Sequence, residues 1–187
     1  MIESRTIGSV RLYICRLGDA ASRRDAEVQA VEALLRRAFG ERCVLSHDSE
    51  GAPFIAGSDV SISISHSRTH AALAVCGRCP VGVDIETRRP QLARVAPRVL
   101  SPAELEVYGA EPDGLLRAWT LKEALYKAAL TPGVDFRSGI VLPLGDKKNE
   151  ATVASPAGGA MCFEVLASEV SEDGALGLVV RRQSFVP

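Results

Sequence analysis

Two short segments of this 187-residue chain hold side chains suited to phosphate chemistry: VGVDIE at 81–86 and WTLKEALYK at 119–127. Alternate residues of a β-strand share a face, so the first segment predicts a strand with Asp84 and Glu86 on one side. Gly82 on the same side would let a ligand approach the backbone. Paired carboxylates repel each other unless a cation, water or basic groups separate them, and such oxygen ligands suit Mg²⁺. The alternative is a strand that runs out into solvent.

The second segment has helical spacing and two different faces. One face is apolar and should pack on a core: Leu121, Ala124, Leu125 and Ala128. The opposite face carries charged and aromatic side chains: Trp119, Lys122, Glu123, Tyr126 and Lys127. One interpretation is a solvated face, on which Glu123 and Lys127 form an i,i+4 ion pair worth about 0.2–0.5 kcal/mol. The other is that this face lines a site.

A third segment, SISISHS at 61–67, combines a strand pattern with small polar groups. Ile62 and Ile64 are predicted to face the core, and the strand ends at Ser65 and His66. Their hydroxyl and imidazole groups could bind a phosphate oxygen. A single histidine at a strand end is otherwise a structural or exposed residue.

Together the three segments would supply three carboxylates, two lysines and one histidine: Asp84, Glu86, Glu123, Lys122, Lys127 and His66. If the fold brings them together, they form a one-metal phosphoryl-transfer site. The metal and the lysines would neutralise charge on the transferred group and on the leaving group. A metal-dependent nuclease or phosphohydrolase could be built on the same acids.

An α+β fold of two similar halves is expected to position these segments. Each half is predicted to contain a long helix, 21–39 or 113–130, followed by about three antiparallel strands. A capping box, SPAE at 101–104, predicts an additional short helix. The halves should span residues 1–95 and 96–187 and be related by a pseudo-twofold axis, with the ligand site in the crevice between them.

Composition narrows the class of protein. A hydrophobic content of 47% is enough for a packed core, and a formal net charge of −1 argues against a general nucleic-acid binder. The arginines, including Arg88 and Arg89 after the strand, are expected to be mostly solvated. Five scattered cysteines suit reduced thiols, and the single C-x-x-C lacks the further ligands of a zinc site. No run approaches the ~20 apolar residues of a membrane span, so we expect a cytoplasmic protein. We also expect it to be a monomer.

The spacing and order of these motifs resemble a known family. VGVDIE followed by WTLKEALYK is similar to the paired signature of the 4'-phosphopantetheinyl transferases, specifically the Sfp-like group with a W-x-x-K-E-A-x-x-K helix. GAPF at 51–54 and SISHS at 63–67 resemble further motifs of that group in the same order. The resemblance implies two similar α+β halves with coenzyme A in the cleft. It also implies transfer of 4'-phosphopantetheine to a serine of an apo acyl or peptidyl carrier protein, with release of 3',5'-ADP.

The resemblance assigns roles to single positions. Asp84, Glu86 and Glu123 would bind Mg²⁺ on the pyrophosphate, and Glu123 would also be the general base for the incoming serine. Lys127 would stabilise the pyrophosphate charge. His66, next to Ser65, would hydrogen-bond a phosphate oxygen, and Lys122 would assist at the same end.

One departure from the family pattern concerns the 3'-phosphate of coenzyme A. Many members have lysine in the middle of G-x-P, whereas this chain has Ala52. Arg36 and Arg37 are the predicted substitutes. A relative that binds coenzyme A or a carrier protein without catalysis is the alternative from a different class. The presence of the family's acidic and basic residues, Asp84, Glu123 and Lys127, argues against it.

Overall fold

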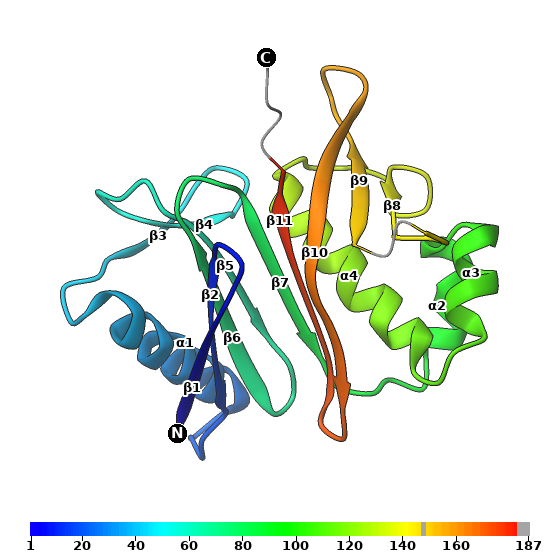
Figure 1. The fold of residues 1–187 in the computed structure, drawn as a ribbon. Coiled ribbons are helices and arrows are strands. Elements are labelled where there is room, and N and C mark those ends of the chain that lie inside the picture. The colour runs from blue at the N-terminus through cyan, green and yellow to red at the C-terminus, as the bar shows by residue number, and fades with distance from the viewer. Residues whose placement is uncertain (147–148, 183–187) are drawn as a thin grey trace.

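The computed structural model describes residues 1–146 and 149–182 and shows an α+β fold with two main sheets side by side (Figure 1). All neighbouring strands of the described sheets are antiparallel. The first sheet has the order β1-β2-β6-β5. Its strands are β1 (Ile2–Ile7), β2 (Val10–Arg16), β5 (Ser61–His66) and β6 (His70–Cys76).

Helix α1 (Arg23–Phe39) packs on the first sheet. Ser22 caps its first turn by accepting the backbone N–H of Asp25 at 3.1 Å, and the chain leaves the helix at Gly40, with φ of 84°. Small and branched apolar residues cover the buried face: Ala26, Ala30, Leu34 and Leu35. A short hairpin of β3 (Leu45–His47) and β4 (Pro53–Ile55) follows.

The second sheet has the order β7-β11-β10-β9-β8 and is covered by helix α4 (Gly114–Ala129). Its strands are β7 (Val81–Glu86), β8 (Ile140–Val141), β9 (Glu150–Ala154), β10 (Ala160–Ser171) and β11 (Gly174–Arg181). Helices α2 (Leu92–Val99) and α3 (Pro102–Gly109) pack beside α4. The predicted capping box is confirmed, because Ser101 and Glu104 exchange side-chain and backbone hydrogen bonds. None of the described helices is long and apolar enough to span a membrane.

Strand β7 joins the two sheets. It precedes the expected boundary at residue 95, yet it pairs with β11 and so forms the edge of the second sheet. Its other edge lies along β5, where backbone N–H groups of β7 donate to serine hydroxyls. These contacts run from Val81 to Ser61, from Val83 to Ser63 and from Ile85 to Ser65, at 3.2, 3.0 and 3.2 Å. We call the row formed by Ser61, Ser63 and Ser65 the serine seam. The pseudo-twofold relation between the halves stays a prediction.

Both faces of β7 are buried, which excludes one alternative left open by the sequence and corrects one expectation. Asp84 and Glu86 are only 5% and 6% exposed, so the strand does not run out into solvent. Gly82 faces helix α4 rather than a ligand. A Cβ atom at this position would lie 1.9 Å from the backbone oxygen of Ala124. Glycine is therefore what lets α4 approach the strand closely enough to bring its side chains to Asp84.

Candidate active site

A cavity of about 990 Å³ lies between the two sheets. One wall comes from α1, the β3–β4 hairpin and the end of β5, and the other wall comes from β7 and α4. The α1 side presents apolar residues between charged ones, whereas the opposite side holds three carboxylates and a lysine: Asp84, Glu86, Glu123 and Lys127. The fold therefore brings the predicted acidic residues into one cavity.

Helix α4 contributes one edge of its surface to this cavity. Trp119, Glu123 and Lys127 are spaced by four residues and all line it, while the apolar stripe predicted for the other face is buried in the core. Two members of the predicted polar face lie elsewhere. Tyr126 packs against Phe136, with ring centroids 5.3 Å apart, and Lys122 is fully buried.

Asp84 is held in the cavity by two side-chain donors. Its Oδ1 accepts hydrogen bonds from Ser65 Oγ and from Lys127 Nζ, each at 2.8 Å. Lys127 also donates to the backbone oxygen of Val83 at 3.2 Å. The other carboxylate oxygen of Asp84, Oδ2, is buried and has no hydrogen-bond partner in the described residues. A buried anionic oxygen without a partner is costly, so this atom marks a place where a ligand would be stabilised.

Glu86 is held by Arg89, which the sequence analysis expected to be solvated and to which it gave no role at the site. Arg89, three residues later, donates to Oε1 of Glu86 at 2.7 Å, and its Nε forms an ion pair with Oε2 without hydrogen-bond geometry. Burial raises the pKa of Glu86, Arg89 opposes this effect, and the charge of Asp84 adds to it. In the sequence, only the spacing of three residues between Glu86 and Arg89, across the end of the strand, could have indicated this ion pair.

Glu123 lies on the same wall of the cavity as Asp84 and makes no hydrogen bond or ion pair with the side chains of the described residues. Burial raises its pKa, and the negative charges of Asp84 and Glu86 raise it further, while Lys127 lowers it. A carboxylate that is partly buried, unpaired and raised in pKa is well suited to accept a proton from a substrate hydroxyl.

The three carboxylates fit a divalent cation only if other ligands complete its coordination. Within residues 1–146 and 149–182, no group of three or more Asp, Glu, His or Cys side chains is arranged so that it could hold a metal ion by itself. The unpaired Oδ2 of Asp84 nevertheless favours a positive charge between the carboxylates, as does their mutual repulsion, which adds to burial in raising the pKa values of Glu86 and Glu123. Mg²⁺ commonly binds in this way, through one or two carboxylates and the oxygens of a substrate phosphate.

Comparison with known proteins identifies the family. Residues 80–174, just over half of the chain, match the family model ACPS, the 4'-phosphopantetheinyl transferase superfamily. This range contains all three carboxylates and Lys127. The chain belongs to this superfamily. It is 34% identical over 93 residues to "4'-phosphopantetheinyl transferase HetI" of Nostoc sp. (strain PCC 7120 / SAG 25.82 / UTEX 2576), covering 44% of this chain and 39% of that protein.

A second relative is a "4'-phosphopantetheinyl transferase" of Bacillus subtilis. The two chains are 33% identical over 100 residues, covering 50% of this superfamily member and 41% of the relative. The chain thus matches about two-fifths of the length of these curated relatives.

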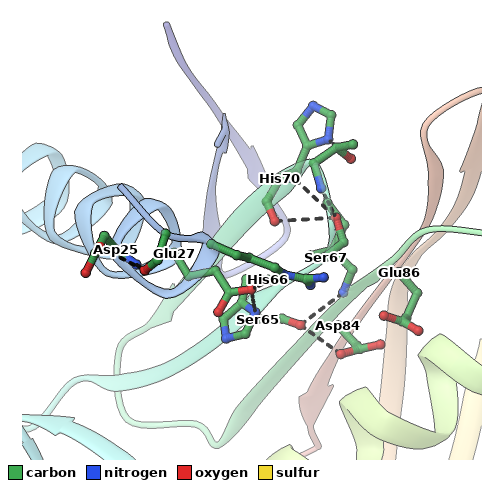
Figure 2. A network of polar contacts seen from close by, with 12 residues as sticks. Asp25, Glu27, Ser65, His66, Ser67, His70, Asp84 and Glu86 are labelled. Atoms are coloured by element: carbon green, nitrogen blue, oxygen red, sulfur yellow. Dashed lines mark hydrogen bonds and ion pairs between the residues drawn. The ribbon is translucent and has the colours of Figure 1, made fainter. Parts of the chain in front are cut away.

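His66 lies on the wall of the cavity formed by α1 and the end of β5, opposite Asp84 and Lys127. Its ring is 45% exposed, and Nδ1 is 3.4 Å from Oε1 of Glu27 on α1. Figure 2 shows His66 near Glu27 of α1, at the end of β5 that also carries Ser65. The imidazole is therefore placed where it can contact a ligand that enters from the α1 side.

The prediction that Lys122 contacts coenzyme A is wrong for this fold, because the side chain points into the interior of the second half. Its Nζ donates to Glu104 Oε2 at 2.9 Å, to the backbone oxygen of Phe136 at 2.7 Å and to that of Ile140. The side chain is 0% exposed. Burial lowers the pKa of Lys122, and Glu104 opposes that effect. Lys122 is one residue before Glu123 but faces the core.

The two predicted substitutes for the 3'-phosphate contact lie in different places. Arg36 lines the cavity, where it pairs with Glu32 at 3.7 Å and with Glu41 at 3.5 Å. Arg37 points away from the cavity into a separate depression formed with residues of β1 and β2. Adjacent residues on a helix are about 100° apart, which explains why the two side chains point in different directions. The structure thus places Arg36, but not Arg37, at the cavity.

Proposed function

We propose that this chain transfers 4'-phosphopantetheine from coenzyme A to a serine hydroxyl of an apo acyl or peptidyl carrier protein, releasing 3',5'-ADP. The observation that supports this most strongly is the convergence of three carboxylates and Lys127 in one cavity between the two sheets. All four residues lie within the region that matches the transferase superfamily. The volume of about 990 Å³ is in the upper range of small-molecule sites, as a ligand the size of coenzyme A requires.

The cation of this reaction is proposed to be Mg²⁺, held by Asp84, Glu86 and Glu123 together with pyrophosphate oxygens. When bound, it would neutralise negative charge on the pyrophosphate and on the departing 3',5'-ADP. The protein's own contribution is to keep these carboxylates close together in spite of their repulsion. Burial in β7, the contact of Lys127 with Asp84 and that of Arg89 with Glu86 achieve this.

Glu123 is proposed as the general base. Its carboxylate accepts the proton of the incoming serine hydroxyl as the serine oxygen forms a bond to the phosphorus on the pantetheine side. The bond from that phosphorus to the bridging oxygen breaks, and the electron pair leaves with 3',5'-ADP. The raised pKa of Glu123 moves its basicity toward neutral pH, where proton abstraction is more favourable.

Lys127 and His66 are proposed to bind phosphate oxygens from opposite walls of the cavity. Lys127 uses two of its three N–H donors for Val83 and Asp84, and its side chain is 29% exposed. The third donor is available to a phosphate oxygen. His66 and Ser65 lie at the end of β5. Arg36 is proposed to contact the nucleotide end, at the cost of its pairing with Glu32 and Glu41.

The direct test is mass spectrometry of apo carrier proteins from fatty-acid, polyketide and peptide synthesis. Each is incubated with the purified protein, coenzyme A and Mg²⁺. We expect at least one to gain the mass of phosphopantetheine, and excess EDTA to abolish the gain. Release of 3',5'-ADP without any carrier protein would indicate a phosphohydrolase instead. Binding of coenzyme A with neither product would indicate the non-catalytic relative.

A further inference from the structure

Ser65 differs from the other two residues of the serine seam. Ser61 and Ser63 each accept one backbone N–H from β7. Ser65 accepts the N–H of Ile85 in the same way, at 3.2 Å, but its hydroxyl also donates to Oδ1 of Asp84 at 2.8 Å. Figure 2 shows the two contacts meeting at the Ser65 hydroxyl. A hydroxyl has a single hydrogen to donate, so the accepted N–H from the strand directs that hydrogen to Asp84.

This contact makes the two oxygens of Asp84 unequal. Oδ1 receives hydrogen bonds from Ser65 and from Lys127, whereas Oδ2 receives none from the described residues. Ser65 and Asp84 are 6% and 5% exposed, so water does not readily replace these donors. The carboxylate is thereby fixed with one oxygen occupied by protein donors and one oxygen available to a cation.

We propose that Ser65 is a positioning residue that restricts Asp84 to coordinating a divalent cation through Oδ2 alone, and that it thereby favours Mg²⁺ over Ca²⁺. Mg²⁺ requires near-octahedral geometry and takes carboxylates through single oxygens, whereas Ca²⁺ accepts six to eight ligands and often takes both oxygens of a carboxylate. Because Oδ1 already accepts hydrogen bonds from two donors, coordination of a cation by both oxygens of Asp84 is disfavoured. The inference rests on the proposed function in one respect, because it concerns the same carboxylates.

The serine seam provides a matched pair of variants. Ser65→Ala removes the contact with the backbone of β7 and the contact with Asp84, whereas Ser63→Ala removes only a contact with that backbone. Ser63 and Ser65 are both buried, at 3% and 6% exposure, so the two variants should lose similar stability. Any difference in cation affinity between the two variants then measures the effect of the hydrogen bond from the Ser65 hydroxyl to Asp84.

Cation binding can be measured without any turnover. Trp119, the single tryptophan, lines the cavity and provides a fluorescence signal for titration of the protein alone with MgCl₂ and with CaCl₂. For Ser65→Ala we expect Mg²⁺ affinity to fall by about 10–100-fold, as for other residues that orient metal ligands. The affinity for Ca²⁺ should fall much less, so the preference for Mg²⁺ shrinks. Ser63→Ala should keep the wild-type ratio, and Ser65→Thr, which retains the hydroxyl, should restore it.

Two results would overturn the inference: an equal change of both affinities in Ser65→Ala, or a wild-type protein that binds neither cation. Thermal unfolding of both alanine variants, measured in parallel, shows whether a loss of affinity follows from unfolding. The assay contains neither coenzyme A nor a carrier protein. A protein that fails to transfer phosphopantetheine but shows the expected change in cation preference would contradict the proposed function and leave this inference standing.

Discussion

The ammonium nitrogen of Lys122 lies 2.9 Å from Oε2 of Glu104, and neither side chain is more than 1% exposed. Glu104 also accepts the backbone N–H of Ser101 and that of Leu142, each at 2.8 Å. The buried ion pair therefore connects the start of α3, the middle of α4 and the segment after β8. Its role is to hold α4 in place, which fixes the neighbouring residue Glu123 at the cavity.

Lys122→Met should destabilise the protein by about 3–5 kcal/mol, because it leaves the charge of Glu104 buried without its partner. Urea unfolding measures the loss. The double variant Lys122→Met/Glu104→Gln should recover a large part of it, since no charge then remains unpaired. If Lys122→Met instead keeps wild-type stability and raises the KM for coenzyme A, Lys122 is a ligand contact after all.

Gly82→Ala should cost about 3 kcal/mol or more, because its Cβ would meet the backbone of α4 rather than a side chain that can move. Gly77→Ala is the matched control. No atom lies within 4 Å of a Cβ at that position, so its stability should stay within about 0.5 kcal/mol of wild type. Equal stability of the two variants in urea would show that α4 does not pack on β7 as described.

Lys127→Ala should lower kcat by about 100-fold or more, while the affinity for coenzyme A changes far less. The reason is the position of Lys127 in the cavity beside Asp84, where it is proposed to stabilise charge that develops during transfer. Steady-state kinetics and calorimetric titration with coenzyme A separate the two effects. Arg182→Ala, which removes a cation paired with Glu150 outside the cavity, should leave both unchanged.

Glu123→Gln tests the proposed base separately from cation binding. If Glu123 only bound the cation, raising the Mg²⁺ concentration would restore most of the rate. We expect a large residual defect at saturating Mg²⁺, because the amide cannot accept the serine proton. The decrease of wild-type turnover at acid pH should also be flatter in the variant. Full rescue by Mg²⁺ with an unchanged pH profile would exclude Glu123 as the base.

The raised pKa of Glu123 predicts a specific pH dependence of stability. A group whose pKa is higher in the folded state stabilises the fold below its ordinary value of 4.5, and this contribution is lost as pH rises through the folded-state pKa. Without a divalent cation, Glu123→Gln should therefore become more stable relative to wild type as pH rises above 4.5. Differential scanning calorimetry from acid to neutral pH measures the difference. A constant difference would contradict the raised pKa.

Much of the local structure followed from the sequence, because periodicity and caps act over short distances. The strands at 61–66 and 81–86 and the helix at 114–129 fall where the patterns predicted them. Helix α2 did not, since Pro97 inside it lacks a backbone N–H and is a signal against a helix. Strand β1 was also missed, because four of its six residues are exposed and show no apolar alternation.

The predictions that failed concern side chains whose direction is decided by packing between distant segments. Helical spacing placed Lys122 and Glu123 on one face, yet adjacent residues diverge enough that one enters the core and the other enters the cavity. The same divergence separates Arg36 from Arg37. Likewise, alternation along β7 predicted one buried face, and only the packing of α4 on the other face explains Gly82. These outcomes depend on contacts between distant segments, which a local pattern does not contain.

The placement of β7 has a consequence for synthesis of the chain on the ribosome. β7 is translated well before β11, because three helices and three strands separate them in the described order. The serine seam can form with β5 as soon as the first sheet folds, but the other edge of β7 has no strand partner until β11 emerges. An unpaired edge of apolar residues favours association with other chains. The nascent protein should therefore depend on chaperones until its last described strand is complete.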